Sequence, residues 1–309
     1  MLIQFISENF RSLKKEQTLS LVRSSGNEMP DNFFQTTAAA TPELLKSAVI
    51  YGANASGKSN VIKALGSMLH IIQNSFSKKI NRPIETESFL FDALSRNEPT
   101  LYDISIIVPL TNEEGSLQET RVDYGFVADK NMVYEEWLSV YPKGKEQNWF
   151  HREYKQEKSD YDWKMSTYFK GERESWKNQT RPDQLFFSSA VHLNSEQLKP
   201  IYESLSEEIL IVRTDRISNE LSKSLCKNSD KEKTILISLL KSAGIEVDDI
   251  TFRKPKIRHE DFPKELPEIV KDKILKEIEE AIVAKTETFF VYFDGTDNPP
   301  EIPLHEESD

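Results

Sequence analysis

The chain has 309 residues, of which 38% are hydrophobic and 29% charged, a composition typical of a soluble globular protein. Its formal net charge of −11 disfavours a protein coated in nucleic acid, although a local basic groove stays possible. Cys226 is the single cysteine, which excludes an intramolecular disulfide and a multi-cysteine zinc site. No apolar run approaches the roughly 20 residues needed to cross a bilayer, and the N-terminus lacks a secretory signal. We therefore expect a cytoplasmic protein that does not enter a membrane.

The first 22 residues predict a β-hairpin. Apolar residues alternate partly over residues 1–10, which predicts a strand. Arg11, Ser12 and Leu13 then form a turn, and residues 17–22 predict the returning strand. The polar stretch over residues 23–42 predicts a loop with one helical turn.

The strongest signal in the chain lies in residues 47–69. Residues 48–51 form a short β-branched apolar run, the pattern of a buried strand. Residues 52–59, Gly-Ala-Asn-Ala-Ser-Gly-Lys-Ser, fit the phosphate-loop pattern G-x-x-x-x-G-K-[ST]. Apolar residues then recur at helical spacing; they are Val61, Ile62, Leu65, Met68 and Leu69. Strand, glycine loop and helix therefore follow in the order that this motif requires.

The residue types of this loop suit the binding of a phosphate chain. Gly52 and Gly57 allow the backbone to curl, so that successive N–H groups point at phosphate oxygens. Lys58 can reach the β- and γ-phosphates, and the Ser59 hydroxyl can bind Mg²⁺. A chance glycine turn is the alternative, but a random match in a chain of this length has a probability of about 1%. We predict nucleotide binding at this loop.

The following 80 residues predict an antiparallel layer. Residues 75–98 resemble a loop, and strands are predicted over residues 101–110, 121–128, 132–141 and 149–154. Residues 155–182 are polar but rich in aromatic side chains. These aromatic residues could stack nucleic-acid bases, yet the acidic residues among them favour packing of a small subdomain.

The rest of the chain alternates predicted helices and strands. Helices are predicted over residues 196–205, 220–225, 233–242 and 267–285. Residues 185–187 and 288–293 predict strands, and residues 245–252 an extended segment. The five histidines show no metal-ligand spacing.

These features together resemble the ABC-type ATPases of the AAA15/AAA21 group. That group is similar in its head domain to overcoming-lysogenization-defect nucleases and to chromosome-maintenance and DNA-repair ATPases. The resembling residues are Asn9-Phe10-Arg11-Ser12-Leu13, residues 50–60, Glu98-Pro99-Thr100, Tyr124-Gly125, Glu136-Trp137-Leu138 and Glu307-Ser308-Asp309. The resemblance implies an α/β fold with α+β features: a P-loop NTPase with an ABC-ATPase-like head, an N-terminal antiparallel β layer and a helical insertion.

The resemblance also implies a site for ATP and Mg²⁺. Arg11 and Ser12 match an N-terminal motif beside the nucleotide; a surface arginine in a hairpin turn is the less favoured interpretation of Arg11. Asn54 matches an asparagine that faces the γ-phosphate across a dimer interface. Ser59 is the expected Mg²⁺ ligand. The expected ATP-binding residues are Arg11, Ser12, Gly52, Ala53, Asn54, Ala55, Ser56, Gly57, Lys58, Ser59 and Asn60.

Two departures from the family pattern limit what is expected of catalysis. Residues 86–92 lack the glutamine that contacts Mg²⁺ and the attacking water. The chain ends at Asp309, where the family continues into its signature motif, an apolar strand ending in Asp-Glu, and a later histidine; a polar tail is the alternative interpretation of residues 307–309. We assign no catalytic residue and expect a fragment of a longer ATPase, the alternative being a protein that only binds ATP.

We predict three parts: an ATPase lobe over residues 1–154, a mostly helical insertion over residues 155–285, and a returning strand over residues 286–309. The expected function is an ATP-binding head that dimerises around nucleotide and acts as a switch or scaffold for a nuclease or toxin effector in anti-phage defence. One alternative is a DNA-repair or chromosome-maintenance ATPase that acts directly on DNA. Another is a non-hydrolysing scaffold. A P-loop kinase or GTPase is disfavoured because no N-K-x-D pattern occurs.

Overall fold

The computed structural model divides the chain into two compact units, Met1–Ile211 and Val212–Asp309, and each is described by itself. The predicted division at residues 154 and 285 stays a prediction. The predicted helix over residues 267–285 and the motif at residues 307–309 lie outside the described residues, as does the helix over residues 220–225 except for residue 223. The described residues are 1–26, 29–80, 82–112, 114–212, 223, 226, 229–253, 287–293, 295–296 and 299–304.

The first unit is built on a seven-stranded sheet of order β2-β1-β5-β6-β7-β8-β9, in which every neighbouring pair runs antiparallel. Consecutive strands from β5 to β9 pair with each other, as expected of a meander joined by short turns. The strands are β1 (Leu2–Glu8), β2 (Gln17–Ser20), β5 (Thr100–Thr111), β6 (Leu117–Ala128), β7 (Val133–Tyr141), β8 (Gln147–Lys155) and β9 (Asp160–Met165). The predicted hairpin and the predicted antiparallel layer are confirmed.

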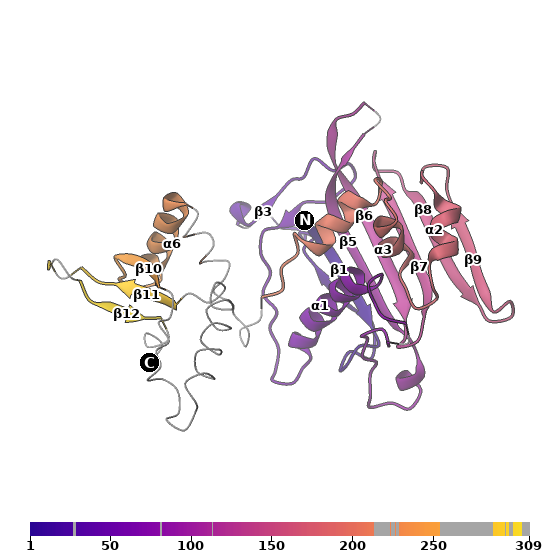
Figure 1. The fold of residues 1–309 in the computed structure, drawn as a ribbon, viewed down its shortest axis with the longest axis horizontal. Coiled ribbons are helices and arrows are strands. Elements are labelled where there is room, and N and C mark those ends of the chain that lie inside the picture. Colours follow the sequence, from indigo (N-terminus) through magenta and orange to yellow (C-terminus); the bar gives the residue numbers. More distant parts are fainter. Residues whose placement is uncertain are drawn as a thin grey trace, which may run out of the picture. The chain divides into compact units, whose positions relative to one another are not determined.

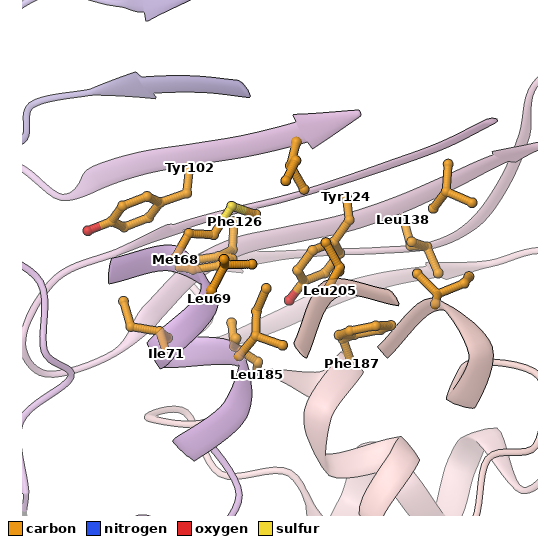
Figure 2. Close-up of a cluster of buried hydrophobic side chains, with 14 of the residues drawn as sticks. Met68, Leu69, Ile71, Tyr102, Tyr124, Phe126, Leu138, Leu185, Phe187 and Leu205 are labelled. Carbon is orange, nitrogen blue, oxygen red and sulfur yellow. The ribbon is translucent and has the colours of Figure 1, made fainter. Parts of the chain in front are cut away.

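Helices cover one face of this sheet (Figure 1). They are α1 (Lys58–Asn74), α2 (Arg173–Gln179), α3 (Phe186–His192) and α4 (Lys199–Ser206). Side chains of α1, α3 and α4 meet those of β5, β6 and β7 in one apolar core (Figure 2). Met68 of α1 and Phe126 of β6, for example, are both 0% exposed. Burying a side chain of this size stabilises the fold by about 1.5–3 kcal/mol, so the core holds α1 firmly on the sheet.

A smaller element covers part of the opposite face. The 3₁₀ turn η1 (Pro30–Asn32) precedes the two-stranded sheet of β3 (Phe33–Phe34) and β4 (Leu44–Leu45). Leu44 packs with Ala38, Ile3 and Ile107 in a separate small core. The loop with one helical turn that was predicted over residues 23–42 is thus largely confirmed.

The aromatic stretch after β8 belongs to the core. Phe169 is 0% and Trp176 4% exposed, and Trp163 meets the Phe186 ring edge-on with centroids 5.0 Å apart. The packing interpretation is therefore confirmed for these three rings.

Two predicted strands are wrong. Residues 185–187 contain the start of α3, because the side chain of Glu136 accepts hydrogen bonds from the N–H groups of Phe186 and Phe187 and so caps a helix. Residues 48–51 form no strand, and Val49 and Tyr51 are 71% and 87% exposed. None of their backbone groups pairs with another described residue, and a strand needs such a neighbour.

A buried ion pair joins the sheet to α3. Glu136 and Arg152 are 0% and 1% exposed and lie opposite each other on β7 and β8. The Glu136 carboxylate accepts from Arg152 Nε at 2.8 Å and from the Tyr124 hydroxyl at 3.1 Å, besides capping α3. The second arm of Arg152 donates to the Gln184 carbonyl at 2.6 Å. Both charges are thus compensated inside the core.

A second carboxylate, that of Asp103, lies on the opposite face of the sheet. The Trp137 indole N–H donates to it at 3.2 Å. Burial, and then the neighbouring charge of Asp123, raise the pKa of Asp103 to about 6. Since the unfolded chain has an ordinary pKa near 4, ionising Asp103 in the fold costs free energy.

The second unit contains a helix packed on a three-stranded antiparallel sheet. Its elements are α6 (Asp230–Ser242), β10 (Asp249–Arg253), β11 (Glu287–Val291) and β12 (Glu301–Pro303). Ser229 caps α6 by accepting from the N–H of Glu232 at 3.3 Å. The helix predicted over residues 233–242 and the strand over residues 288–293 are confirmed. Among the described residues of both units, no helix has the length and apolar character to span a membrane.

Glu136→Ala tests the buried ion pair. The substitution leaves the Arg152 charge buried without its partner, so we expect a loss of about 3–5 kcal/mol in the free energy of unfolding, measured by guanidinium denaturation. Glu135→Ala is the matched control, because its more exposed bond to His151 contributes under about 1 kcal/mol. Equal losses in the two variants would contradict the assignment.

Asp103→Asn tests the raised pKa. Between pH 4 and 6 the folded chain binds more protons at Asp103 than the unfolded chain does, so this group makes stability fall as pH rises. Asparagine does not ionise, so it removes this pH-dependent loss of stability, and its side-chain oxygen can still accept the Trp137 hydrogen bond. We expect the variant to match the parent at pH 4 and to gain about 1–2 kcal/mol on it by pH 7. A difference that is independent of pH would contradict the raised pKa.

Candidate functional site

The predicted phosphate loop lies at the start of α1 and is exposed to solvent. Gly57 precedes the helix with φ +97°, and its carbonyl accepts from the Asn60 N–H at 2.8 Å. Within the described part of the chain, the N–H groups of Gly57, Lys58 and Ser59 have no hydrogen-bond acceptor. Unpaired N–H groups at the positive end of a helix dipole form an anion site. The loop therefore has the backbone groups that a phosphate needs.

The two glycines of the loop differ in how strongly the fold requires them. A Cβ atom on Gly52 would lie 2.7 Å from Ser56 Oγ, the end of an exposed side chain that can turn away. On Gly57 it would lie 3.2 Å from Ser12 Oγ, and φ +97° is already strained for any residue with a side chain. The second glycine of the motif thus has a steric reason in the fold.

Lys58 folds back over the loop. Its Nζ atom donates to the carbonyls of Gly52 at 2.8 Å and Ala53 at 2.7 Å. The ammonium group is thereby held at the mouth of the loop, where it would meet an incoming phosphate as a point charge. These residues fit the phosphate chain of a nucleotide.

The hairpin turn of residues 9–13 lies against the loop. Phe10 and Leu13 exchange backbone hydrogen bonds at 2.9 and 2.7 Å, and Asn60 Nδ2 donates to Ser12 Oγ at 2.7 Å. The structure thus brings the turn and the phosphate loop together, as the resemblance implied for Ser12. That these residues contact ATP stays a prediction.

The Arg11 side chain has a different partner. Its Nη2 atom donates to Glu87 Oε1 at 2.5 Å, and its backbone N–H donates to the Glu87 carbonyl at 2.8 Å. Arg11 Nε is buried and has no hydrogen-bond partner among the described residues. Glu87 is not among the predicted site residues, because no spacing pattern in the sequence links it to Arg11, 76 positions away.

Asn9 fixes the loop that carries Glu87. Asn9 adopts φ +54°, a left-handed conformation that asparagine tolerates better than most residues. Its Nδ2 atom donates to the carbonyls of Ser95 and Glu98 at 2.8 and 2.9 Å, and its Oδ1 atom accepts from the Phe89 N–H at 3.1 Å. Ser95 is the first residue of the 3₁₀ turn η2 (Ser95–Asn97), and Glu98 follows its last residue. We call residues 87–99 the Glu87 loop.

The remaining predicted residues lie at the exposed rim of the phosphate loop. Ala53, Asn54, Ala55, Ser56 and Ser59 are all exposed. The Ser59 hydroxyl is the loop's candidate ligand for Mg²⁺. Among the described residues, no group of three histidine, cysteine or acidic side chains is arranged to hold a metal.

A cavity of about 320 Å³ lies away from the loop, at the other end of α1. Its floor is apolar, and at its rim Lys78 pairs with Asp183 and His70 with Glu85. Because the cavity is lined by residues of the C-terminal end of α1 and the phosphate loop lies at its N-terminal end, the cavity is separate from the phosphate site.

Residues 47–175 match the AAA_21 family, described as "AAA domain, putative AbiEii toxin, Type IV TA system". The match covers the phosphate loop, α1 and strands β5 to β9, which is less than half of the chain. It confirms the resemblance to the AAA15/AAA21 group and indicates that these residues form an AAA-type domain, which is a P-loop NTPase domain. No curated protein and no solved structure gives a significant match to this chain.

Gly57→Ala tests the geometry of the loop. The added methyl group meets Ser12 and forces an unfavourable φ, so we expect ATP affinity to fall at least about tenfold, measured by isothermal titration calorimetry.

Gly66→Ala in the same helix is the matched control. A Cβ atom there meets only Ile211 at 3.8 Å, an ordinary contact, and alanine stabilises a helix by about 0.5–1 kcal/mol over glycine. This variant should keep its ATP affinity and unfold at a higher temperature. Comparable affinities for the two variants would refute the role given to Gly57.

Proposed function

We propose that this chain carries the ATP-binding part of an ABC-type ATPase head that dimerises around nucleotide and switches or scaffolds a partner effector in anti-phage defence. The observation that carries the proposal is the phosphate loop itself, where free N–H groups, the sterically required Gly57 and Lys58 converge at the start of α1. The antiparallel sheet beneath α1 supports the ABC-type assignment.

The residues of the loop have separate tasks in ATP binding. The N–H groups of Gly57, Lys58 and Ser59 bind phosphate oxygens, and the Lys58 ammonium exchanges its two carbonyl acceptors for phosphate. The Ser59 hydroxyl holds Mg²⁺, which when bound neutralises phosphate charge. We assign no residue to the activation of water, so ATP hydrolysis belongs to the complete ATPase.

The proposed dimer rests on Asn54. This residue lies in the exposed part of the loop, and its side chain forms no hydrogen bond with another described residue. It is therefore available to a second copy across the nucleotide. The proposed effector, a nuclease or a toxin, follows from the family resemblance and from the toxin named in the family description.

Lys58→Ala tests the proposal directly. Loss of the ammonium group removes a charge-assisted contact to phosphate, so we expect ATP affinity to fall at least about tenfold, measured with a fluorescent ATP analogue. Lys63→Ala is the matched control, because Lys63 is exposed one turn further along α1 and forms no ion pair with a described residue.

Unchanged ATP affinity in Lys58→Ala would sink the proposal. In the same samples, light scattering should show an ATP-dependent dimer for the parent and the control but not for Lys58→Ala. ATP binding without any phosphate release by a longer form of the protein would favour the non-hydrolysing scaffold.

A further inference from the structure

The Arg11 side chain forms its ion pair with Glu87 rather than with a residue of the phosphate loop. Arg11 belongs to the turn that touches the loop through Ser12 and Asn60, yet its guanidinium binds Glu87 at 2.5 Å. The Arg11 and Glu87 side chains are 36% and 55% exposed. The cation closest in sequence to Ser12 is thus held by a carboxylate that solvent can reach.

The Arg11 side chain is incompletely bonded in this position. Its Nε atom is buried and has no acceptor among the described residues, and its backbone has φ +48°. A residue held in an unfavourable conformation beside a binding site is often kept there for function. A guanidinium with an unused donor gains hydrogen bonds if it turns to a group with more acceptor oxygens.

We propose that Glu87 competes with the phosphates of ATP for Arg11, so that nucleotide binding breaks the Arg11–Glu87 ion pair and alters the Glu87 loop. The inference rests on the proposed function and adds regulation to the same site. It assigns to Glu87 the role of a positioning residue that holds Arg11 until nucleotide arrives.

The free energies of the two contacts allow Arg11 to exchange Glu87 for the phosphates of ATP. A partly exposed ion pair contributes little free energy because water screens both charges. A nucleotide's phosphates carry more charge than one carboxylate and can accept from both arms of a guanidinium. Arg11 therefore moves to phosphate at a modest cost.

Other contacts also join the Glu87 loop to the hairpin turn and the residue after it. They are the backbone bond from Arg11 to the Glu87 carbonyl, the bonds of Asn9, and a partly exposed ion pair of Lys14 with Asp92 at 3.3 Å. Between these anchors it carries Leu90, Phe91 and Leu94, which are 62%, 83% and 75% exposed. A segment with exposed side chains and few buried contacts opens at low cost, so a lost ion pair should change its rate of cleavage by chymotrypsin, which cuts after such residues.

Glu87→Gln tests the competition. The amide keeps the shape of the side chain but loses its charge, so we expect ATP to bind about 2- to 5-fold more tightly. Glu98→Gln is the matched control: it changes the same charge in the same loop, and the Glu98 side chain is exposed and has no ion partner among the described residues. We expect its affinity to stay within about 1.5-fold of the parent.

Adding Glu87→Gln to an Arg11→Ala variant distinguishes two causes of tighter binding. One is the release of Arg11 from Glu87, and the other is the loss of electrostatic repulsion between Glu87 and ATP. In the Arg11→Ala variant, Glu87→Gln should no longer tighten ATP binding, because no guanidinium remains to be released. ATP should also speed chymotryptic cleavage of the Glu87 loop in the parent, whereas Glu87→Gln should show the faster rate without ATP.

These experiments test the inference and the proposed function separately. An unchanged affinity in Glu87→Gln, or an equal gain in the Arg11→Ala background, overturns the inference and leaves the proposed function standing. Parent protein that does not bind ATP, or a Lys58→Ala variant that binds it normally, overturns the proposed function and the inference with it.

Discussion

The buried ion pair between Glu136 and Arg152 is the contact on which the arrangement of the first unit depends. A carboxylate and a guanidinium with at most 1% exposure are tolerated only if nearly all their hydrogen-bonding capacity is used. Glu136 meets this condition by binding Tyr124 and the first N–H groups of α3, and Arg152 by binding the Gln184 carbonyl and lying over the rings of Tyr161 and Trp163. Strands β6 to β9 and helix α3 are thereby joined at one point.

That rigid base determines where the phosphate loop lies. Helix α1 buries Ala64, Leu65, Met68 and Ile72 on the sheet, so its N-terminal end is fixed while the loop before it stays exposed. In the loop region both candidate phosphate-binding cations already have oxygen partners: Lys58 has two loop carbonyls, and Arg11 has Glu87. To bind a phosphate chain, Lys58 and Arg11 must therefore give up these oxygen partners. The weaker the present contacts are, the higher the affinity for phosphate.

The two failed strand predictions have a common cause. Residues 48–51 and 185–187 are both short apolar runs, and such a run does not by itself distinguish a buried strand from other structure. For residues 185–187 the deciding group is the carboxylate of Glu136, about 50 residues away, which caps a helix. Residues 48–51 form no strand because no described neighbouring strand pairs with them.

The local features could be predicted from the residues alone: the phosphate loop with its glycine spacing, the helix that follows, the N-terminal hairpin and the antiparallel meander. Each of these features depends on residues that are close together in the sequence. Over such short separations, hydrophobic periodicity and turn-forming residues predict the structure. Three contacts become visible only in the folded chain: Arg11 binds Glu87, Asn9 fixes the Glu87 loop, and Glu136 joins Arg152 to α3. The partners of Arg11, Asn9 and α3 lie some 50 to 90 positions away. Glu136 and Arg152 lie on neighbouring strands, and their pairing depends on the register of those strands. A single sequence carries no signal for a side-chain pairing that is selected by packing and burial.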